Sequence, residues 1–184
     1  MLRLQGGEET ALNELMTRWQ QPLVGFIYRY VGNESDALDL AQETFVRVFT
    51  SRSGYKPTAK FSTWLFSIAS NLCHNLVRWR GRHPTVALTG GEDDEDQGDL
   101  LDTLPSTETS PADKAESNDL ASAVKQHIQE LPHDLKTVVL LFEYEDLSYE
   151  EIASVLRCTA KAVETRLYRA RKHLAESLTR WKVV

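Results

Sequence analysis

Hydrophobic residues recur at helical spacing along most of the chain, and the pattern is most regular from residue 147 to residue 174. Ser148 and Glu151 fit the S-x-x-E capping box at the start of a helix. Leu147 and Ile152 occupy the two positions of a hydrophobic staple. Together these residues predict a short helix that begins at Tyr149 and ends near residue 157.

A second helix is predicted directly after it, because Cys158 and Thr159 leave room only for a tight turn. Thr159 can serve as the N-cap of this helix, which runs from about Ala160 onward. Four apolar residues at i, i+4, i+7 and i+11 form one stripe that we expect to be buried: Val163, Leu167, Ala170 and Leu174. The opposite side is polar and mostly basic, and carries Lys161, Thr165, Tyr168, Arg169 and Lys172.

Two short helices joined by a tight turn, the second with a basic outward face, are typical of a helix-turn-helix whose recognition helix comes last. The alternative is a solvated helical hairpin, since a cationic helix face often serves only solubility. Residues 157–172 hold six Lys or Arg and a single acid, Glu164, in a chain whose net charge is −6. This local excess of positive charge favours a DNA-binding surface.

The N-terminal part of the chain predicts four helices. The first covers residues 8–20, and the second is opened by Pro22 and stopped by Gly32. Residues 51–60 form a loop by their Gly, Pro and Ser content, and Ser62 can then cap a long helix that reaches about Arg80. The third helix lies between Gly32 and this loop. It covers residues 35–50 and has an apolar stripe of Leu38, Ala41, Phe45, Val48 and Phe49.

The long helix separates apolar from polar side chains. Its polar side carries Asn71, Asn75 and Arg78. We expect the apolar side to be buried, with Leu65, Ile68, Ala69, Leu72, Leu76 and Trp79.

Aromatic and basic residues gather at both ends of this helix. At its C-terminal end Trp79 lies beside Arg78, Arg80 and Arg82, while Tyr55 and Trp64 lie in or near the preceding loop. This composition suits a site that holds unstacked single-stranded bases. The alternative remains that most of these aromatic residues belong to the core, where amphipathic helices usually place them.

The acidity of the chain is concentrated in one segment. Residues 84–119 contain eleven Asp or Glu and one Lys, a local charge of −10, so the rest of the chain carries +4. Few aromatic residues and many Gly, Ser, Thr and Pro predict a flexible linker there. Helical periodicity resumes at Leu120 and restarts after Pro132, which gives four further helices and no convincing strand. The sequence thus predicts an all-α fold of two small helical domains joined by an acidic linker, with bounds of 1–83, 84–118 and 119–184.

Composition also limits the chemistry. Cys73 and Cys158 are the two cysteines, without CxxC spacing, so we expect neither a disulfide framework nor a zinc site. We interpret Cys73 as a small hydrophobe and His74 as a surface residue without a metal role. No apolar run approaches the ~20 residues of a membrane span, and residues 1–25 lack a signal-peptide pattern, so we expect a cytoplasmic protein without membrane insertion.

Four segments in order and spacing resemble the sigma-70 family of bacterial sigma factors, and specifically the small extracytoplasmic-function (ECF) group. These are DALDLAQETFVRVF at 36–49, FSTWLFSIASNLCHNLVRWRGR at 61–82, LPHDLKTVVLLFEYEDLSYEEIASVL at 131–156 and VETRLYRARKHL at 163–174. The resemblance covers nearly the whole chain. It implies a domain like sigma region 2, the linker, and a domain like sigma region 4 that contains the helix-turn-helix.

The resemblance also implies roles for individual residues. Asp39, Gln42 and Glu43 would bind the clamp coiled coil of core RNA polymerase, and the region 4 domain would meet the polymerase flap. Recognition and melting of the −10 element would fall to Tyr55, Lys56, Trp64, Asn71, Asn75, Arg78 and Arg80. The −35 element would be read in the major groove by Lys161, Glu164, Thr165, Arg166, Tyr168, Arg169 and Lys172.

Two departures from the family pattern stand out. Glu164 lies where relatives often carry Lys or Arg, and a carboxylate accepts a hydrogen bond from cytosine instead of donating to guanine. The turn at Cys158 lacks the expected Gly.

The resemblance also implies partners, namely promoter DNA, core polymerase and an anti-sigma factor.

Three classes of function can be compared with these features of the sequence. A promoter-specificity subunit without catalysis or cofactor accounts for both halves of the chain. A free-standing helix-turn-helix regulator is the alternative, but it leaves the N-terminal half without a ligand-binding or phosphoacceptor domain. An enzyme is disfavoured, because no metal-spaced acidic cluster, phosphate-binding Gly loop or nucleophile and base pair stands out in a predicted folded segment.

Overall fold

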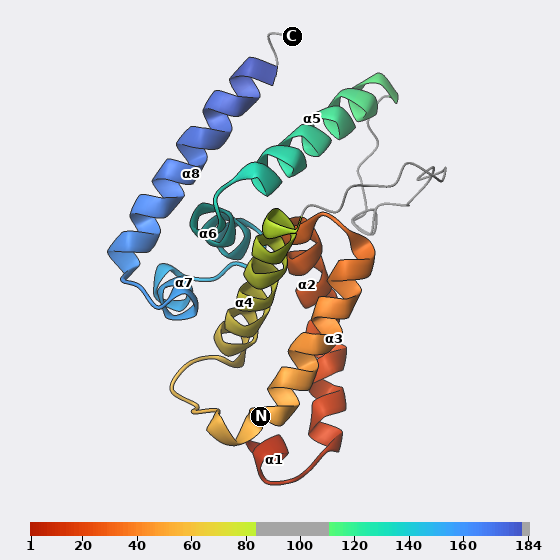
Figure 1. The fold of residues 1–184 in the computed structure, drawn as a ribbon, viewed down its shortest axis with the longest axis vertical. Coiled ribbons are helices and arrows are strands. Elements are labelled where there is room, and N and C mark those ends of the chain that lie inside the picture. The colour runs from red at the N-terminus through yellow and green to blue at the C-terminus, as the bar shows by residue number, and fades with distance from the viewer. Residues whose placement is uncertain (84–110, 182–184) are drawn as a thin grey trace.

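The computed structural model describes residues 1–83 and 111–181, and within these ranges every regular element is helical (Figure 1). The all-α prediction is therefore confirmed. The N-terminal domain contains α1 (Leu2–Gln5), α2 (Thr10–Val31), α3 (Glu34–Thr50), a 3-10 turn (Arg52–Gly54) and α4 (Phe61–Arg82). The C-terminal domain contains α5 (Pro111–Glu130), α6 (His133–Glu143), α7 (Tyr149–Leu156) and α8 (Ala160–Trp181).

The first two predicted helices are one continuous helix, α2, with Pro22 in its interior. The prediction of a break at Pro22 was wrong. An interior proline costs about 3 kcal/mol, because it removes one backbone hydrogen bond and crowds the preceding turn. Burial of a large apolar side chain contributes about 1.5–3 kcal/mol, and four such residues beyond Pro22 are fully or almost fully buried: Leu23, Phe26, Ile27 and Tyr30. Packing therefore outweighs the local penalty.

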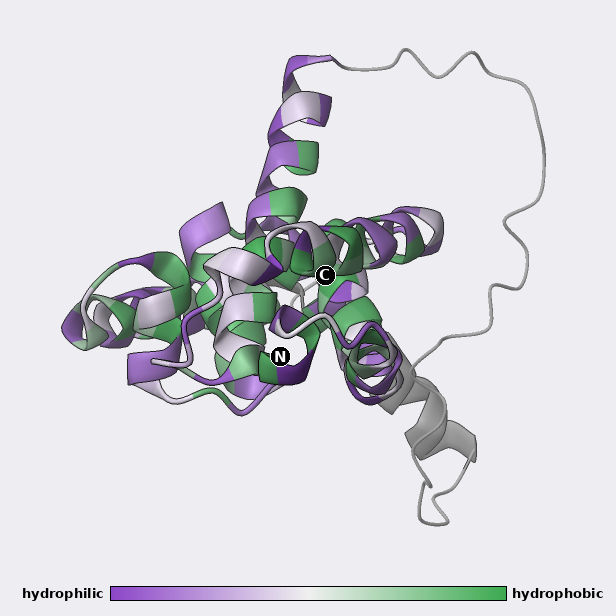
Figure 2. Ribbon diagram, turned by 90° about the horizontal axis from the view of Figure 1, so that it is seen from below, coloured by the Kyte–Doolittle hydropathy of each residue, from purple (hydrophilic) through white to green (hydrophobic). Residues whose placement is uncertain are grey.

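Aromatic side chains form the centre of the N-terminal domain. The rings of Phe26 and Phe66 meet edge to face with centroids 5.2 Å apart, and Trp19 packs edge to face against Phe66 at 6.3 Å. The ribbon coloured by hydropathy shows hydrophobic and hydrophilic residues alternating along each helix, as expected for amphipathic helices (Figure 2). α3 begins at Glu34 with Asn33 as its N-cap, whose side chain accepts a hydrogen bond from the Asp36 amide.

The two domains pack against each other in this structure. α2 contacts α5 and α6, and α4 contacts α7 (Figure 1). Gly32 ends α2 in a left-handed conformation with φ of 78°, and a Cβ there would lie 2.6 Å from the side-chain amide nitrogen of Gln129 on α5. Gly32 thus has two roles: it ends α2 in a left-handed conformation, and its lack of a side chain lets the second domain approach closely.

Other boundaries differ modestly from the predictions. α4 begins at Phe61, one residue before the expected cap at Ser62, and Lys60 provides no side-chain cap. α5 begins at Pro111, inside the segment predicted as linker. The remainder of that predicted linker, residues 84–110, lies outside the described residues.

Candidate nucleic-acid interface

The predicted helix-turn-helix is present, and its local contacts follow from the sequence. Ser148 accepts a hydrogen bond from the Glu151 amide, and the Glu151 carboxylate accepts one from the Ser148 amide, which completes the capping box. Thr159 caps α8 by accepting a hydrogen bond from the Ala162 amide at 3.2 Å. Arg157 adopts the left-handed conformation, with φ of 52°, at the position where a Gly was expected.

α8 presents the predicted recognition face to solvent. Val163, Leu167 and Ala170 are buried as predicted, and Leu174 is half-buried. We define the recognition face as the exposed residues of the opposite side: Lys161, Glu164, Thr165, Tyr168, Arg169 and Lys172. Tyr168 is 70% exposed, which is far more than a ring that packs in a core. Lys161 and Glu164 form an ion pair of 2.7 Å along the helix.

Two further arginines of α8 are engaged within the protein. Arg166 pairs with Asp134 of α6 at 2.9 Å, and its guanidinium lies 3.5 Å from the Cys158 sulfur. Arg171 pairs with Glu143 at 2.7 Å. Both arginines therefore fasten α8 to the rest of its domain. Arg166 was also predicted to contact the −35 element, and in this structure it lies beside the recognition face rather than on it.

The residues predicted for the −10 element lie on two neighbouring parts of the N-terminal domain. Asn71, Asn75 and Arg78 are exposed along α4, and we call these three residues the −10 face. Tyr55 and Trp64 pack together with ring centroids 5.1 Å apart, and both are only half-buried. The backbone carbonyls of Arg52 and Tyr55 each accept a hydrogen bond of 2.8 Å from the Gln5 side chain. The loop is therefore held at its start, while Lys56 remains exposed.

Arg80 has an ion-pair partner that the sequence did not indicate, and Trp79 is exposed where burial was predicted. The Arg80 guanidinium donates two hydrogen bonds of 2.6 and 2.8 Å to the Asp36 carboxylate, and this pair connects α4 to the start of α3. Trp79 was expected in the core and is instead 51% exposed. The helical period assigned it to the apolar side, but Trp79 lies only about 40° around the helix axis from Asn75, at the edge of that side.

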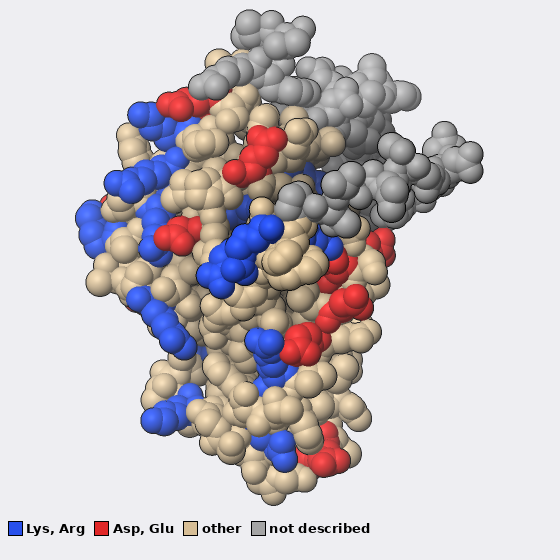
Figure 3. Space-filling model, viewed as in Figure 1, with Lys and Arg blue, Asp and Glu red and all other residues tan. Residues whose placement is uncertain are grey.

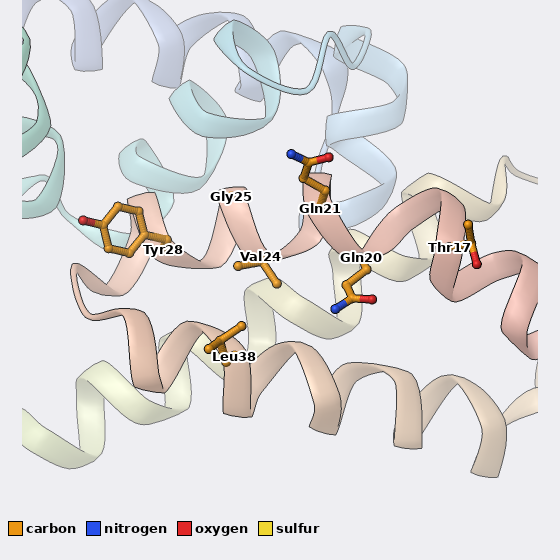
Figure 4. Close-up of a pocket in the computed structure, with 7 residues that line it drawn as sticks. All are labelled: Thr17, Gln20, Gln21, Val24, Gly25, Tyr28 and Leu38. Carbon is orange, nitrogen blue, oxygen red and sulfur yellow. The ribbon is translucent and has the colours of Figure 1, made fainter. Parts of the chain in front are cut away.

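The third predicted surface, on α3, adjoins an apolar groove. Asp39 and Gln42 are exposed and Glu43 is half-buried. Leu38 was expected in the buried stripe, but it is 42% exposed and lines a cavity of about 290 Å³ between α2 and α3. Figure 4 shows that the other residues drawn at this cavity come from α2: Thr17, Gln20, Gln21, Val24, Gly25 and Tyr28. A polar helix face beside an apolar hollow is suited to bind a protein partner.

A cluster of polar groups that sequence patterns did not predict joins the two domains. His133 at the start of α6 contacts the Tyr30 hydroxyl through Nδ1 and stacks on His74 with ring centroids 3.9 Å apart. His74 is thus half-buried, not a free surface residue as predicted. Burial, with a smaller contribution from His74, lowers the pKa of His133 to about 4. His133 is therefore neutral at physiological pH while the domains are packed.

Lys136 and Cys73 lie deeper in the same region. Lys136 is buried and donates hydrogen bonds to the carbonyls of Gln129 and Tyr30, which satisfies its ammonium group across the domain boundary. Burial lowers the pKa of Lys136. Cys73 is fully buried, as the prediction of a small hydrophobe requires, and burial raises its pKa.

A second interdomain contact involves a buried carboxyl group. Glu145, in the connection between α6 and α7, has a side chain only 7% exposed and lies 3.9 Å from Arg29 of α2. Burial raises the pKa of Glu145 to about 7, against the opposing effect of Arg29. Arg29 also lies over the Tyr144 ring at 4.4 Å. Sequence patterns missed these residues because their burial arises only from the contact between domains.

Charge is distributed unevenly over the visible surface. Lys and Arg gather over α8, and Asp and Glu lie mainly toward the α3 side (Figure 3). This places the positive potential on the element that was predicted to meet DNA. Among the described side chains, no three of His, Cys, Asp or Glu come together in a way that could hold a metal ion.

None of the described helices combines the length and apolar character that crossing a membrane requires.

A capped helix-turn-helix with an exposed basic recognition helix, on a second helical domain, defines a DNA-binding protein. Family models agree with this and are more specific: residues 15–83 match sigma-70 region 2, and residues 122–174 match sigma-70 region 4.

Curated relatives extend the match over the full chain. It is 36% identical to the RNA polymerase sigma-H factor of Pseudomonas aeruginosa over 178 residues, which covers 96% of this chain and 90% of that protein. It is 35% identical to the ECF RNA polymerase sigma-E factor of Haemophilus influenzae over 176 residues, 96% of this chain and 92% of that protein. The chain belongs to the sigma-70 family of RNA polymerase sigma factors, in its ECF group.

A solved structure of CnrH in complex with the cytosolic domain of CnrY has a similar fold. The TM-score is 0.68 at 25% identity, and the match covers 97% of this chain and 94% of that one. The sigma factor RpoE of Bartonella quintana, solved in complex with the anti-sigma factor NepR, shares the fold with a TM-score of 0.66 at 20% identity, covering 91% of this chain and 96% of that one.

Proposed function

We propose that this chain binds core RNA polymerase and directs initiation at promoters whose −35 element is read by α8 and whose −10 element is captured by α4 and the loop before it. The observation that carries this proposal is the pairing of two exposed surfaces on one chain. One is the recognition face on a capped helix-turn-helix, and the other is the −10 face on a separate helical domain. A free-standing regulator accounts only for the first.

The domain bounds follow from the same division. We propose residues 1–83 as the region 2 domain, 84–118 as a linker and 119–184 as the region 4 domain. The helical start of α5 at Pro111 and the family match from residue 122 bracket the last boundary. The action needs no catalysis, since promoter melting requires only that unpaired bases be bound more tightly than paired ones. Its place of action is then the cytoplasm.

The α3 surface supports the polymerase contact. Asp39, Gln42 and Glu43 follow one another along the same helix beside the apolar groove at Leu38. We propose that the clamp coiled coil of the polymerase docks here, with the flap meeting the region 4 domain. CnrH has been solved with the cytosolic domain of CnrY, and we propose that an anti-sigma partner likewise controls this chain.

The decisive experiment is transcription from a pool of promoter fragments with purified bacterial core polymerase, with and without this protein. We expect joint binding to core and initiation at fragments that share a −35 and −10 pair. Tight binding to duplex DNA without core, and no effect on core, would instead identify a free-standing regulator.

Variants of the recognition face make the test specific. Arg169→Ala should weaken promoter binding by the holoenzyme and reduce the dependence of the binding constant on salt by about one unit of logarithmic slope, as expected for one lost phosphate contact. Arg18→Ala is the matched control, because Arg18 is an exposed arginine on α2, away from α8. Equal effects of the two substitutions would contradict the role of the recognition face.

A further inference from the structure

We propose that Trp79 is a base-stacking residue that holds an unpaired nucleobase at the end of the −10 element nearest the C-terminus of α4. The proposal deepens the proposed function and rests on it. It assigns a DNA contact to a residue that sequence periodicity placed in the core.

The first argument is the exposure and geometry of the ring. Trp79 is 51% exposed, and among the described residues its aromatic neighbour is His83. His83 stacks on it with ring centroids 5.0 Å apart and an angle of 23° between planes, and His83 Nδ1 lies 3.0 Å from the Trp79 carbonyl oxygen. One face of the indole is therefore supported, and the ring is oriented before any ligand binds. A supported aromatic ring at a surface is the form that stacking platforms for single-stranded nucleic acids take.

The second argument is position along the helix. A helix turns 100° and rises 1.5 Å per residue, so Trp79 lies 40° around the axis and about 6 Å along it from Asn75. Asn71, Asn75 and Trp79 therefore follow one another in a single i, i+4, i+8 row, and Arg78 lies beside this row, about 60° from Asn75 in the opposite direction. A strand bound along Asn71 and Asn75 would next meet the side chains of Trp79 and Arg78.

The third argument is the charge around the ring. Within the described residues, Arg80 is held by Asp36, whereas Arg78 and Arg82 form no ion pair. Both are exposed, and Arg82 Nε lies 3.4 Å from the Arg78 carbonyl oxygen. Two exposed guanidinium groups beside a flat apolar ring are complementary to a nucleotide, which joins an anionic phosphate to a planar base. A purely apolar protein partner would leave both arginines unmatched.

The test measures binding of the holoenzyme to a promoter fragment selected in the transcription assay. A fluorescein-labelled fragment is prepared in two forms, one fully paired and one with the −10 element held open by mismatches. The variants are Trp79→Ala, Trp79→Phe and the matched control Val77→Ala. Val77 is an exposed apolar residue of the same helix, at 41% exposure, but it lies 200° from Asn75 and so faces away from the −10 face. Circular dichroism checks that each variant is folded.

Stacking is worth about 1–3 kcal/mol per base by alanine substitution, which is about 5- to 140-fold in affinity at 1.4 kcal/mol per tenfold. We expect Trp79→Ala to weaken binding of the open fragment by a factor in this range and of the paired fragment by less. Trp79→Phe should recover most of the loss, and Val77→Ala should match the wild type.

Two results would overturn the inference while leaving the proposed function intact. One is wild-type affinity of Trp79→Ala for the open fragment. The other is a loss of affinity in Trp79→Ala that Trp79→Phe does not recover, or a loss that is already present when the protein binds core polymerase without DNA. Either form of this loss would make Trp79 a protein contact. Failure of the wild-type protein to bind core or promoter would overturn the proposed function and this inference together, so the two failures are distinguishable.

Discussion

Replacement of Glu145 by Gln should change how the stability of the protein depends on pH. The side chain is 7% exposed at the contact between domains, and its pKa is raised from 4.5 to about 7. The packed state therefore binds a proton more tightly than the unfolded state. Between pH 4.5 and 7 the folded protein holds more protons at this group, so its contribution to stability falls as the pH rises through that window.

The magnitude follows from the size of the shift. One unit of pKa corresponds to 1.36 kcal/mol, so the full change from below pH 4.5 to above pH 7 is ~3 kcal/mol, and ~2–3 kcal/mol between pH 5 and pH 8. Gln cannot ionise and lacks this dependence. Loss of the carboxylate also affects Arg29, 3.9 Å away, but that effect is a constant offset. The free energy of unfolding of Glu145→Gln minus that of the wild type should therefore increase with pH by this amount, whatever the offset.

The assay is urea unfolding followed by circular dichroism at pH 5, 6, 7 and 8 in one buffer of constant ionic strength. Glu176→Gln is the control, because it makes the same substitution at an exposed glutamate of α8. A difference for Glu145→Gln that is flat from pH 5 to 8 would refute the reasoning. It would mean that the carboxyl group is solvated, and that the domains do not pack around it in solution.

Three further substitutions test separate parts of the structure. Leu167→Ala leaves a cavity beneath the recognition face, where the Leu167 side chain is only 1% exposed. It should lower the free energy of unfolding by about 2–5 kcal/mol and abolish −35 binding. An unchanged urea midpoint would contradict this burial. Ser148→Ala removes half of the capping box and should cost ~1 kcal/mol in the same assay, whereas Ser53→Ala, at an exposed loop position, should cost nothing measurable. His133→Ala removes the contacts to Tyr30 and His74, so we expect a larger radius of gyration by small-angle X-ray scattering, and an unchanged radius would show that these contacts do not hold the domains together.

The opposing pKa shifts at the domain contact have a joint effect. His133 has its pKa lowered from 6.5 to about 4, so its contribution to stability is lost as the pH falls from 6.5 toward 4. The contribution of Glu145 changes in the opposite direction over an overlapping window. The His133 effect is the smaller of the two, since that ring is only half-buried and water screens it. Between pH 5 and 8 the stability of the wild-type protein should consequently fall with rising pH by less than Glu145 alone would cause, whereas the stability of Glu145→Gln should rise.

Sequence patterns predicted those features that depend on neighbours within a few residues. The capping box at Ser148 and the buried stripe beginning at Val163 are local, and the structure confirms both. Pro22 was misinterpreted because the packing that overrides its local penalty comes from other helices. Trp79 was misassigned because it lies at the edge of the apolar side of α4, where helical periodicity does not decide between burial and exposure.

The contacts between domains could not be predicted from the sequence at all. Lys136 lies in an apolar stretch, and its buried ammonium group is satisfied by carbonyls of Gln129 and Tyr30 that only the fold brings near. A buried, hydrogen-bonded lysine and a buried glutamate read in a sequence as ordinary surface charges. The roles of individual site residues stay predictions, since they concern DNA and polymerase that the chain alone does not contain.

The packing of the domains and the proposed capture of DNA use the same surface. Asn71 lines a cavity of about 200 Å³ together with Arg157 and Arg166, and Lys60 of the loop pairs with Glu151 of α7 at 2.8 Å. In this packing Asn71 faces the helix-turn-helix as well as solvent, so a base held by Asn71 would lie beside α7 and α8. The exposed Lys60 pair contributes at most about 1 kcal/mol, and buried ionisable groups weaken the contact further. Because α4 contacts α7 and α2 contacts α5 and α6, a partner that enters between the domains must separate these helices.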